Sequence, residues 1–287
     1  MHPAHNHCST VLTRDSENAT RLEMLPLSDI GTDRDLTFLI SSESSGSFNL
    51  QSVPVSILLR DIDRTMAPDL PSNVHISRHP CLRAKLSQLR SKSTNARETK
   101  ALVHDIALLL GTEALSDLTL ETIGTDETPI GFEYTYESID CTKITVVPIL
   151  RSGLGMVEAI QTVLPEPVSI HHLGLFREKL SLQPVEYYNN LPQSEGSVAK
   201  LAIIVDPIIA TGQTAVAAIQ SLKDWGVEKI VVLSVLGAVP GVTRAAEEWP
   251  EGTQVWVGGV DQELTDRGMI KPGLGDIGDR LFLTIGK

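Results

Sequence analysis

Short apolar runs alternate with longer amphipathic segments from about His79 to the end of the chain. The apolar runs are Ile144–Val147, Leu201–Val205, Ile230–Val235 and Gln254–Val257, with a weaker one near Val168–Leu173. Most of these runs are rich in β-branched residues and are apolar along their whole length, as is typical of strands buried on both faces. The pattern therefore predicts a buried, parallel sheet.

Helical patterns precede and separate these runs. The predicted helices run from Pro80 to about Arg90, from about Asn95 to Leu110, and over the segments that follow Leu150 and Thr214. Pro80 suits a first helical turn, and Gly111 and Gly226 are typical stop signals. Strands that alternate with helices predict an α/β fold with a doubly wound, mostly parallel sheet that carries helices on both faces. Ligands of such folds bind beyond the carboxyl ends of the strands.

The first 72 residues differ from the rest. They are rich in Ser, Thr, Asp and Pro, and Ser41–Ser47 is nearly of low complexity. We expect residues 1–72 to form a largely disordered extension, in which only Val53–Leu59 is apolar enough to dock locally. Residues 73–287 then form the folded domain. Within it, the polar segment Phe176–Ser197 is expected to be a long loop or arm.

Composition narrows the classes of function. Hydrophobic residues make up 41% and charged residues 21%, and the formal net charge is −12. Such a charge argues against binding to nucleic acid or to an anionic membrane, and an anionic substrate would need a local site. The three cysteines form no C-x-x-C pair, and no apolar run approaches a membrane span. We expect a cytoplasmic protein with reduced thiols.

The strongest chemical signal lies in Leu201–Thr214. Here a predicted buried strand ends at Asp206, and a short loop with Thr211 and Gly212 leads into a helix. Such a loop directs backbone N–H groups and a helix N-terminus at one place, which favours a phosphate. The carboxylate at the strand end is placed to accept hydrogen bonds from sugar hydroxyls. An ordinary strand–turn–helix junction capped by Asp206 is the alternative.

A second segment, Val147–Met156, carries an arginine in a similar setting. Arg151 follows a predicted strand and precedes Ser152 and Gly153, which form another tight loop before a helix. A fixed guanidinium beside backbone N–H groups suits a diphosphate. Taken alone, an arginine at a strand end is more often a surface cation than a ligand of a diphosphate.

A third segment, Lys271–Arg280, is rich in glycine. Its glycines match the pattern G-x-G-x-x-G, but only nine residues follow Gly278, too few for the βαβ unit of a dinucleotide fold. A glycine-rich loop can instead fold its backbone around a small planar base, and a plain terminal turn is the alternative. The chain has no G-x-x-x-x-G-K-[ST] motif of a P-loop kinase.

The three segments together, in this order, resemble the diphosphate, ribose-phosphate and uracil loops of the uracil phosphoribosyltransferases, which are type I phosphoribosyltransferases. The resemblance extends from about His79 to the C-terminus. It implies that family's fold, with a small hood and a β-arm added to the sheet. It also implies the family's reaction, in which uracil and 5-phospho-α-D-ribose 1-diphosphate give UMP and diphosphate in pyrimidine salvage.

The resemblance also implies the site residues. It makes Asp206, Arg151 and Asp276 the catalytic set. The phosphoribosyl diphosphate contacts would be Arg151, Arg177, Asp206, Pro207, Ile208, Ile209, Ala210, Thr211, Gly212, Gln213, Thr214 and Asp276. Uracil would be held by Ile270, Gly275, Asp276 and Ile277. Mg²⁺ would be carried mainly by the diphosphate, without a metal site of the protein's own. GTP would be a candidate effector of a homodimer or homotetramer.

Three places depart from the family's pattern. Gln213 stands where a second glycine is usual, Lys271 replaces an aliphatic residue, and Glu178–Ser181 is less acidic and less polar than usual. These departures leave two alternatives open. One is a catalytically weak or inactive member of the fold with a regulatory or binding role. The other is transfer to a different base.

Overall fold

The computed structural model describes residues 69–177, 184–192 and 198–284, and the backbone of four strands nearer the N-terminus. The chain divides into two compact units, Met1–Asp69 and Leu70–Lys287. In the first unit, four strands form an antiparallel sheet in chain order, namely β1 (Ser9–Arg14), β2 (Asn18–Glu23), β3 (Thr37–Ser44) and β4 (Ser47–Pro54). We expected no strands here. The largely disordered extension over 1–72 stays a prediction, and most of Val53–Leu59 lies outside the described residues.

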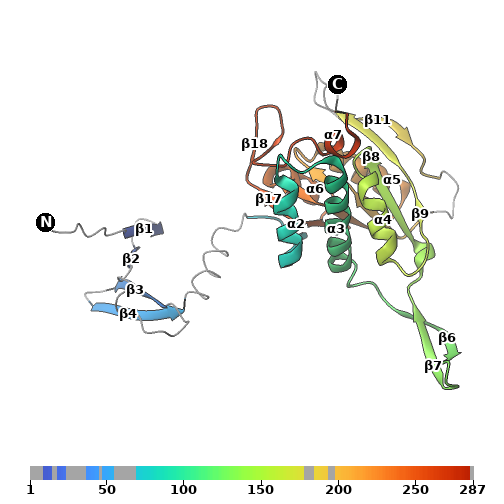
Figure 1. Cartoon of the computed structure of the whole chain (residues 1–287), viewed down its shortest axis with the longest axis horizontal. Helices are drawn as coiled ribbons and strands as arrows, with labels where there is room; N and C mark the ends of the chain where they lie inside the picture. Colours follow the sequence, from blue (N-terminus) through green and yellow to red (C-terminus); the bar gives the residue numbers. More distant parts are fainter. Residues whose placement is uncertain are drawn as a thin grey trace. The chain divides into compact units, whose positions relative to one another are not determined.

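The second unit is built on an eight-stranded sheet within the described residues (Figure 1). The strands along it are β11 (Pro184–Asn189), β10 (Leu173–Arg177), β8 (Ile144–Leu150), β12 (Leu201–Val205), β14 (Lys229–Ser234), β16 (Thr253–Val257) and β5 (Val74–Ile76), and β9 (Ser169–Ile170) also pairs with β8. All neighbours are parallel except β10 and β11. The predicted mostly parallel sheet is confirmed.

Helices cover both faces of this sheet. One face packs against α2 (Pro80–Arg90), α3 (Ala96–Ala114) and α4 (Leu154–Val163), and the other against α5 (Gln213–Trp225) and α6 (Val239–Glu247). Strand β12 shows why its whole run is apolar. Ile203 and Val205 join the first core cluster, whereas Ala202 and Ile204 join the second. Every side chain of this buried strand therefore needs an apolar partner.

Helix α2 has its predicted bounds, but the expected stop of α3 at Gly111 is wrong, since α3 continues to Ala114. A Cβ at Gly111 would lie 2.8 Å from Cδ1 of Ile160 on α4. The glycine therefore serves close packing between α3 and α4 rather than a helix end.

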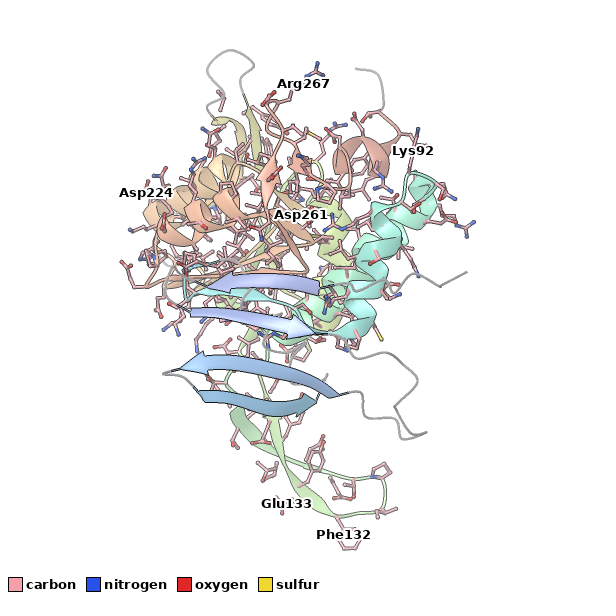
Figure 2. All side chains as sticks on the ribbon, turned by 90° about the vertical axis from the view of Figure 1, so that its left-hand side faces the viewer. Lys92, Phe132, Glu133, Asp224, Asp261 and Arg267 are labelled. Atoms are coloured by element: carbon pink, nitrogen blue, oxygen red, sulfur yellow. The ribbon has the colours of Figure 1, made fainter. Side chains whose placement is uncertain are left out.

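Several smaller elements complete the unit. Strands β6 (Glu121–Glu127) and β7 (Glu133–Ser138) form a hairpin that the apolar pattern did not predict, with Phe132 and Glu133 at its tip (Figure 2). Strands β10 and β11 build the predicted arm, of which residues 178–183 and 193–197 lie outside the described part. We assign the hood to the hairpin of β18 (Glu263–Leu264) and β19 (Ile270–Lys271) and the loop that follows it.

We predict that removing residues 1–72 leaves the second unit folded and active, because the core and the three motif segments lie after the cut. Asn73 then becomes the first native residue. Its Nδ2 donates hydrogen bonds to the carbonyl oxygens of Ala246 (3.0 Å) and Thr253 (2.9 Å), which anchors β5. Thermal unfolding and activity of the truncated and full chains give the test. An insoluble product, or loss of most activity, contradicts the prediction.

A second truncation at residue 69 controls for Leu70, which packs against the cluster under α5 and α6. Asn73→Ala in the full chain should lower the free energy of unfolding by about 1–3 kcal/mol, because two carbonyls lose their donor.

Candidate active site

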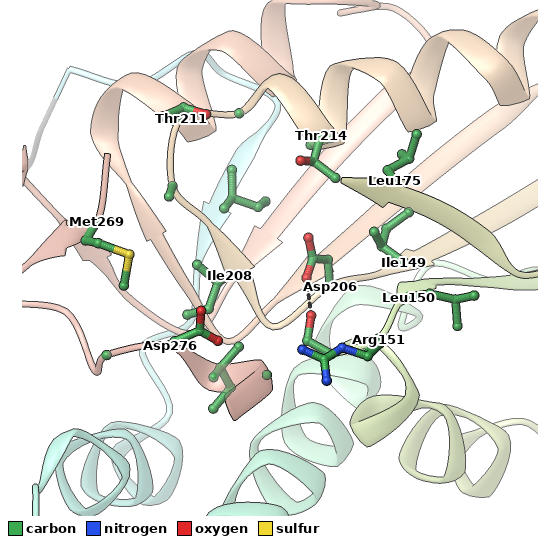
Figure 3. Close-up of a pocket in the computed structure, with 18 of the residues that line it drawn as sticks. Ile149, Leu150, Arg151, Leu175, Asp206, Ile208, Thr211, Thr214, Met269 and Asp276 are labelled. Carbon is green, nitrogen blue, oxygen red and sulfur yellow. Dashed lines mark hydrogen bonds between the residues drawn. The ribbon is translucent and has the colours of Figure 1, made fainter. Parts of the chain in front are cut away.

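The carboxyl ends of β8 and β12 lie side by side, because the two strands are parallel and Val205 pairs with Pro148. The residues that follow the two strands are therefore brought together. The hydroxyl of Ser152 donates a hydrogen bond to Oδ1 of Asp206 over 3.1 Å, drawn as the dashed line in Figure 3. This bond joins the Arg151 segment to the Asp206 segment.

The loop after Asp206 is braced from behind by α6. Gly212 has φ +81°, and a Cβ there would collide with the carbonyl oxygen of Gly241, so only glycine suits this position. Arg244 of α6 donates a hydrogen bond to the carbonyl of Thr211. Helix α5 begins at Gln213, directly after this turn. The loop thus presents the N-terminus of α5 in a fixed geometry that suits an anion.

A cavity of about 400 Å³ lies where the three motif segments meet (Figure 3). Its lining is Ile149, Leu150, Arg151, Ser152, Leu175, Tyr187, Asp206, Ile208, Ile209, Ala210, Thr211, Gly212, Thr214, Ala215, Met269, Gly275, Asp276, Ile277 and Gly278. The cavity lies beyond the carboxyl ends of β8 and β12, where a doubly wound sheet binds its ligands.

Most of the residues that the sequence nominates line this cavity together. They are Arg151, Asp206, Ile208, Ile209, Ala210, Thr211, Gly212, Thr214, Gly275, Asp276 and Ile277. Three others are outside the lining: Pro207 is buried, Gln213 is the first residue of α5, and Ile270 is buried in the core. The side chain of Arg177 lies outside the described residues. The roles of all the nominated residues, inside and outside the lining, stay predictions.

The sequence did not nominate several of the lining residues. Tyr187 comes from β11 of the arm, and a Cβ at Gly174 on β10 would lie 2.7 Å from its ring. Met269 is 40% exposed and directly precedes β19. Ser152 could have been nominated, because it directly follows Arg151 in the sequence. Tyr187 could not have been nominated, because only the register of the arm places it at the cavity.

Asp206 is the carboxyl group with the most unusual setting. Burial raises the pKa of Asp206 to about 7, although the Ser152 hydroxyl and the backbone N–H of Ile208 donate hydrogen bonds that favour the charged form. Near neutral pH the neutral form of this carboxyl group is therefore favoured more than in an ordinary aspartate. A cation or a set of hydroxyl donors at this place favours its ionised form.

Arg151 and Asp276 face the cavity with more exposed side chains. The guanidinium of Arg151 lies 6.0 Å from the ring centre of Phe282, and its Nη2 is 3.9 Å from Oδ1 of Asp279. The side chain of Arg151 is 55% exposed, so this ion pair is weak. Asp276 is the N-cap of α7 (Ile277–Phe282) and accepts a hydrogen bond from the backbone N–H of Asp279 over 3.0 Å.

The two single-residue departures from the family's pattern both lie outside the lining. Nζ of Lys271 is 2.8 Å from Oε2 of Glu263 on β18, and both side chains are 64% exposed. The lysine therefore pairs along the β18–β19 hairpin. Gln213 enters α5 directly after the glycine turn. Neither residue fills the space that a substrate would take.

Within residues 69–177, 184–192 and 198–284, no helix is long and apolar enough to cross a membrane. No group of three or more His, Cys, Asp or Glu residues in these ranges is arranged to hold a metal ion.

Known proteins resemble this chain closely. The family model described as uracil phosphoribosyltransferase matches residues 76–284. A uracil phosphoribosyltransferase of Finegoldia magna is 42% identical over 213 residues, which cover 74% of this chain and 99% of the relative. One from Caulobacter vibrioides is 39% identical over the same shares.

A solved structure, that of the AQ2163 protein from Aquifex aeolicus, is 32% identical with a TM-score of 0.67 and covers 74% of this chain and 98% of its own. These relatives are matched over nearly their full length, and the matched part of this chain is the unit that holds the cavity. The chain belongs to the uracil phosphoribosyltransferase family.

Proposed function

We propose that the chain transfers the phosphoribosyl group of 5-phospho-α-D-ribose 1-diphosphate to uracil, which gives UMP and diphosphate, as a step of pyrimidine salvage. The observation that carries this proposal is that the Arg151, Asp206 and Asp276 segments meet in one cavity. Each segment has the chemistry for one part of the substrates. The family membership of the chain supports the same reaction.

The Asp206 segment would hold the ribose and its 5′-phosphate. The carboxylate of Asp206 would accept hydrogen bonds from the ribose hydroxyls. The backbone N–H groups of Ala210–Thr214, Gln213 included, would hold the phosphate at the N-terminus of α5. Pro207, Ile208 and Ile209 connect the two parts of this site. The α6 brace keeps the loop in shape before the substrate arrives, which lowers the cost of ordering it.

The diphosphate would be held by Arg151, with Arg177 as its partner. The weak contact of Arg151 with Asp279 leaves the guanidinium able to move to a stronger anion. As the C1′–oxygen bond breaks, positive charge develops at C1′, and a ring nitrogen of uracil forms the new bond to that carbon. The chain's contribution is to position the two reactants and to stabilise the departing diphosphate.

Uracil would bind along Gly275, Asp276 and Ile277, mainly through backbone N–H and C=O groups. Gly275 has φ +82°, a conformation that glycine adopts readily. Ile270 would support this loop from the core, where its side chain is buried. A pocket formed by backbone groups can match the two N–H donors and two carbonyl acceptors of the base.

Mg²⁺ fits the chemistry of this cavity, since carboxylates and hydroxyls gather there and Mg²⁺ prefers oxygen ligands. It would be carried mainly by the diphosphate, and Asp276 would approach it or the ribose from the glycine-rich loop. When bound, the ion would neutralise part of the substrate's negative charge.

We further propose a homodimer or homotetramer with GTP as an effector. The β6–β7 hairpin supports an interface between copies, since Ile130 is 80% and Phe132 67% exposed. A cytoplasmic location stays a prediction from the cysteine pattern.

The proposal is tested by incubating the full chain with phosphoribosyl diphosphate and each of uracil, cytosine, hypoxanthine and orotate. Each reaction is run with and without Mg²⁺ and GTP. We expect nucleotide only from uracil, and only with Mg²⁺. Product from another base would reassign the substrate. Binding of phosphoribosyl diphosphate without any product would indicate a regulatory protein instead.

Asp206→Asn should keep the fold and lower kcat/KM about tenfold to a few hundredfold, because about 1–3 kcal/mol is expected for a charge-assisted hydrogen bond. Steady-state kinetics on matched preparations give the answer. An activity within twofold of the parent would refute the role of Asp206.

The raised pKa of Asp206 predicts a pH-dependent stability in the absence of ligands. Between its ordinary value of 3.8 and about 7, the folded state keeps a proton that the unfolded state has lost. The stability contributed by this group therefore falls as the pH rises through that window. Asp206→Asn removes the titration, so its Tm relative to the parent should rise between about pH 4 and about pH 7. A Tm difference independent of pH argues against a raised pKa.

Gly275→Val should raise the KM for uracil strongly and leave the binding of phosphoribosyl diphosphate nearly intact. A β-branched side chain is strained at a φ of +82° and lies where the base must approach. Ile277→Val is the matched control and should have little effect. Titration calorimetry with phosphoribosyl diphosphate and Mg²⁺ complements the kinetics. Equal weakening of the binding of both ligands would indicate that the loop has only a structural role. Unchanged binding of both would indicate that uracil binds elsewhere.

A further inference from the structure

The glycine-rich loop after β19 has one side that faces the cavity, which we call its front, and an opposite side, its back. Residues from Gly275 to Gly278 line the cavity, whereas Gly273 and Leu274 are buried and lie outside its lining. Arg90, Asp261 and Arg280 hold the back of this loop. We call these three side chains the loop clamp.

The first part of the clamp is an ion pair in which both groups also bind the loop. Nη1 and Nη2 of Arg90 lie 2.8 and 2.7 Å from the two carboxylate oxygens of Asp261. The same Nη1 donates to the carbonyl of Gly273, and the N–H of Gly273 donates to Asp261, both over 2.9 Å. The side chain of Asp261 is only 8% exposed. Both backbone polar groups of Gly273 are therefore fixed by one bidentate pair.

The second part of the clamp is Arg280 of α7. Its Nη1 donates to the carbonyls of Leu89 (2.6 Å) and Leu274 (2.8 Å), and its Nη2 donates to that of Ser91 (3.2 Å). Leu89 and Ser91 flank Arg90 at the end of α2. The end of α2 and the back of the loop are thus tied together twice, by two arginines that approach from different elements.

The clamp is also connected to the segment 206–214, which would hold the ribose and its phosphate and which we call the phosphate loop. Asp261 ends β17 (Val260–Asp261), which pairs with β15 (Leu236–Ala238), and β15 pairs with β13 (Ile208–Ile209). Both residues of β13 line the cavity. One small parallel sheet therefore connects the carboxylate of Asp261, behind the glycine-rich loop, to the segment that would hold the ribose phosphate.

We propose that Arg90, Asp261 and Arg280 are positioning residues that set the affinity for uracil by fixing the backbone of Gly275–Ile277 relative to the phosphate loop. This inference rests on the proposed function, since it assigns the front of the loop to the base. When backbone groups bind the base, no side chain can change rotamer to restore a hydrogen bond that a shift of the loop has broken. The affinity for the base therefore depends on the position of the loop backbone, and a small displacement of the loop weakens binding.

The same helix offers a matched control. Nζ of Lys85 lies 2.7 Å from Oδ2 of Asp105 and joins α2 to α3, and neither residue lines the cavity. Loss of this pair tests the general effect of removing an ion pair from α2. Only loss of the loop clamp should raise the KM for uracil.

The experiment compares Arg90→Lys, the double variant Arg90→Met with Asp261→Asn, and Lys85→Met in the full chain. Lysine keeps the charge but cannot reproduce the bidentate contact. The double variant leaves no unpaired buried charge, which protects the fold. We expect the KM for uracil to rise on the order of ten- to a hundredfold in the double variant, and less in Arg90→Lys. The Kd for phosphoribosyl diphosphate with Mg²⁺ should stay within about twofold in all three, and Lys85→Met should match the parent.

Hydrogen exchange over residues 271–278 gives a second readout that needs no turnover. It should become faster in both clamp variants and stay unchanged in Lys85→Met. An unchanged KM for uracil, equal weakening of both ligands, or unchanged exchange in the double variant would overturn the proposal. If the parent protein itself forms no UMP, the proposed function fails, and the exchange data still decide whether the clamp holds the loop.

Discussion

The hydrogen bond from Ser152 to Asp206 joins the two segments on which the cavity depends. It spans 3.1 Å between residues that follow adjacent parallel strands, β8 and β12. Parallel pairing brings the ends of both strands to one edge of the sheet, and the bond fixes the two loops there in a common frame. The glycine-rich loop closes the cavity from a third direction. Without this frame, the three segments would be separate turns with no shared ligand.

The cavity also explains how an acidic chain can take a polyanionic substrate. The net charge of −12 opposes such a ligand at long range. At short range, the phosphate loop offers backbone N–H groups and a helix N-terminus, and Arg151 adds a cation. Burial raises the pKa of Asp206 to about 7, which favours its neutral form and so lowers its repulsion of an anion. Local geometry thus outweighs the net field, which is screened by salt beyond about 10 Å.

Much of this picture could be predicted from the sequence. Strand β12, which ends just before Asp206, is buried on both faces, so its apolar run clearly predicted a buried strand, and α2 has its predicted bounds. Features set by packing between distant segments could not be predicted. Gly111 looked like a helix stop because its contact with α4 is not visible in the local pattern. Tyr187 and the Arg90–Asp261 pair depend on register and on contacts across 171 positions of the chain.

The proposed role of Asp206 predicts that its partly buried carboxyl group ionises as the ribose of phosphoribosyl diphosphate binds. Titration calorimetry near pH 7 in buffers of different ionisation enthalpy measures the protons exchanged when phosphoribosyl diphosphate binds with Mg²⁺. The parent protein should release a fraction of a proton more than Asp206→Asn, because burial raises the pKa of its carboxyl group to about 7 before the substrate binds. Equal proton exchange in the two proteins would contradict the account.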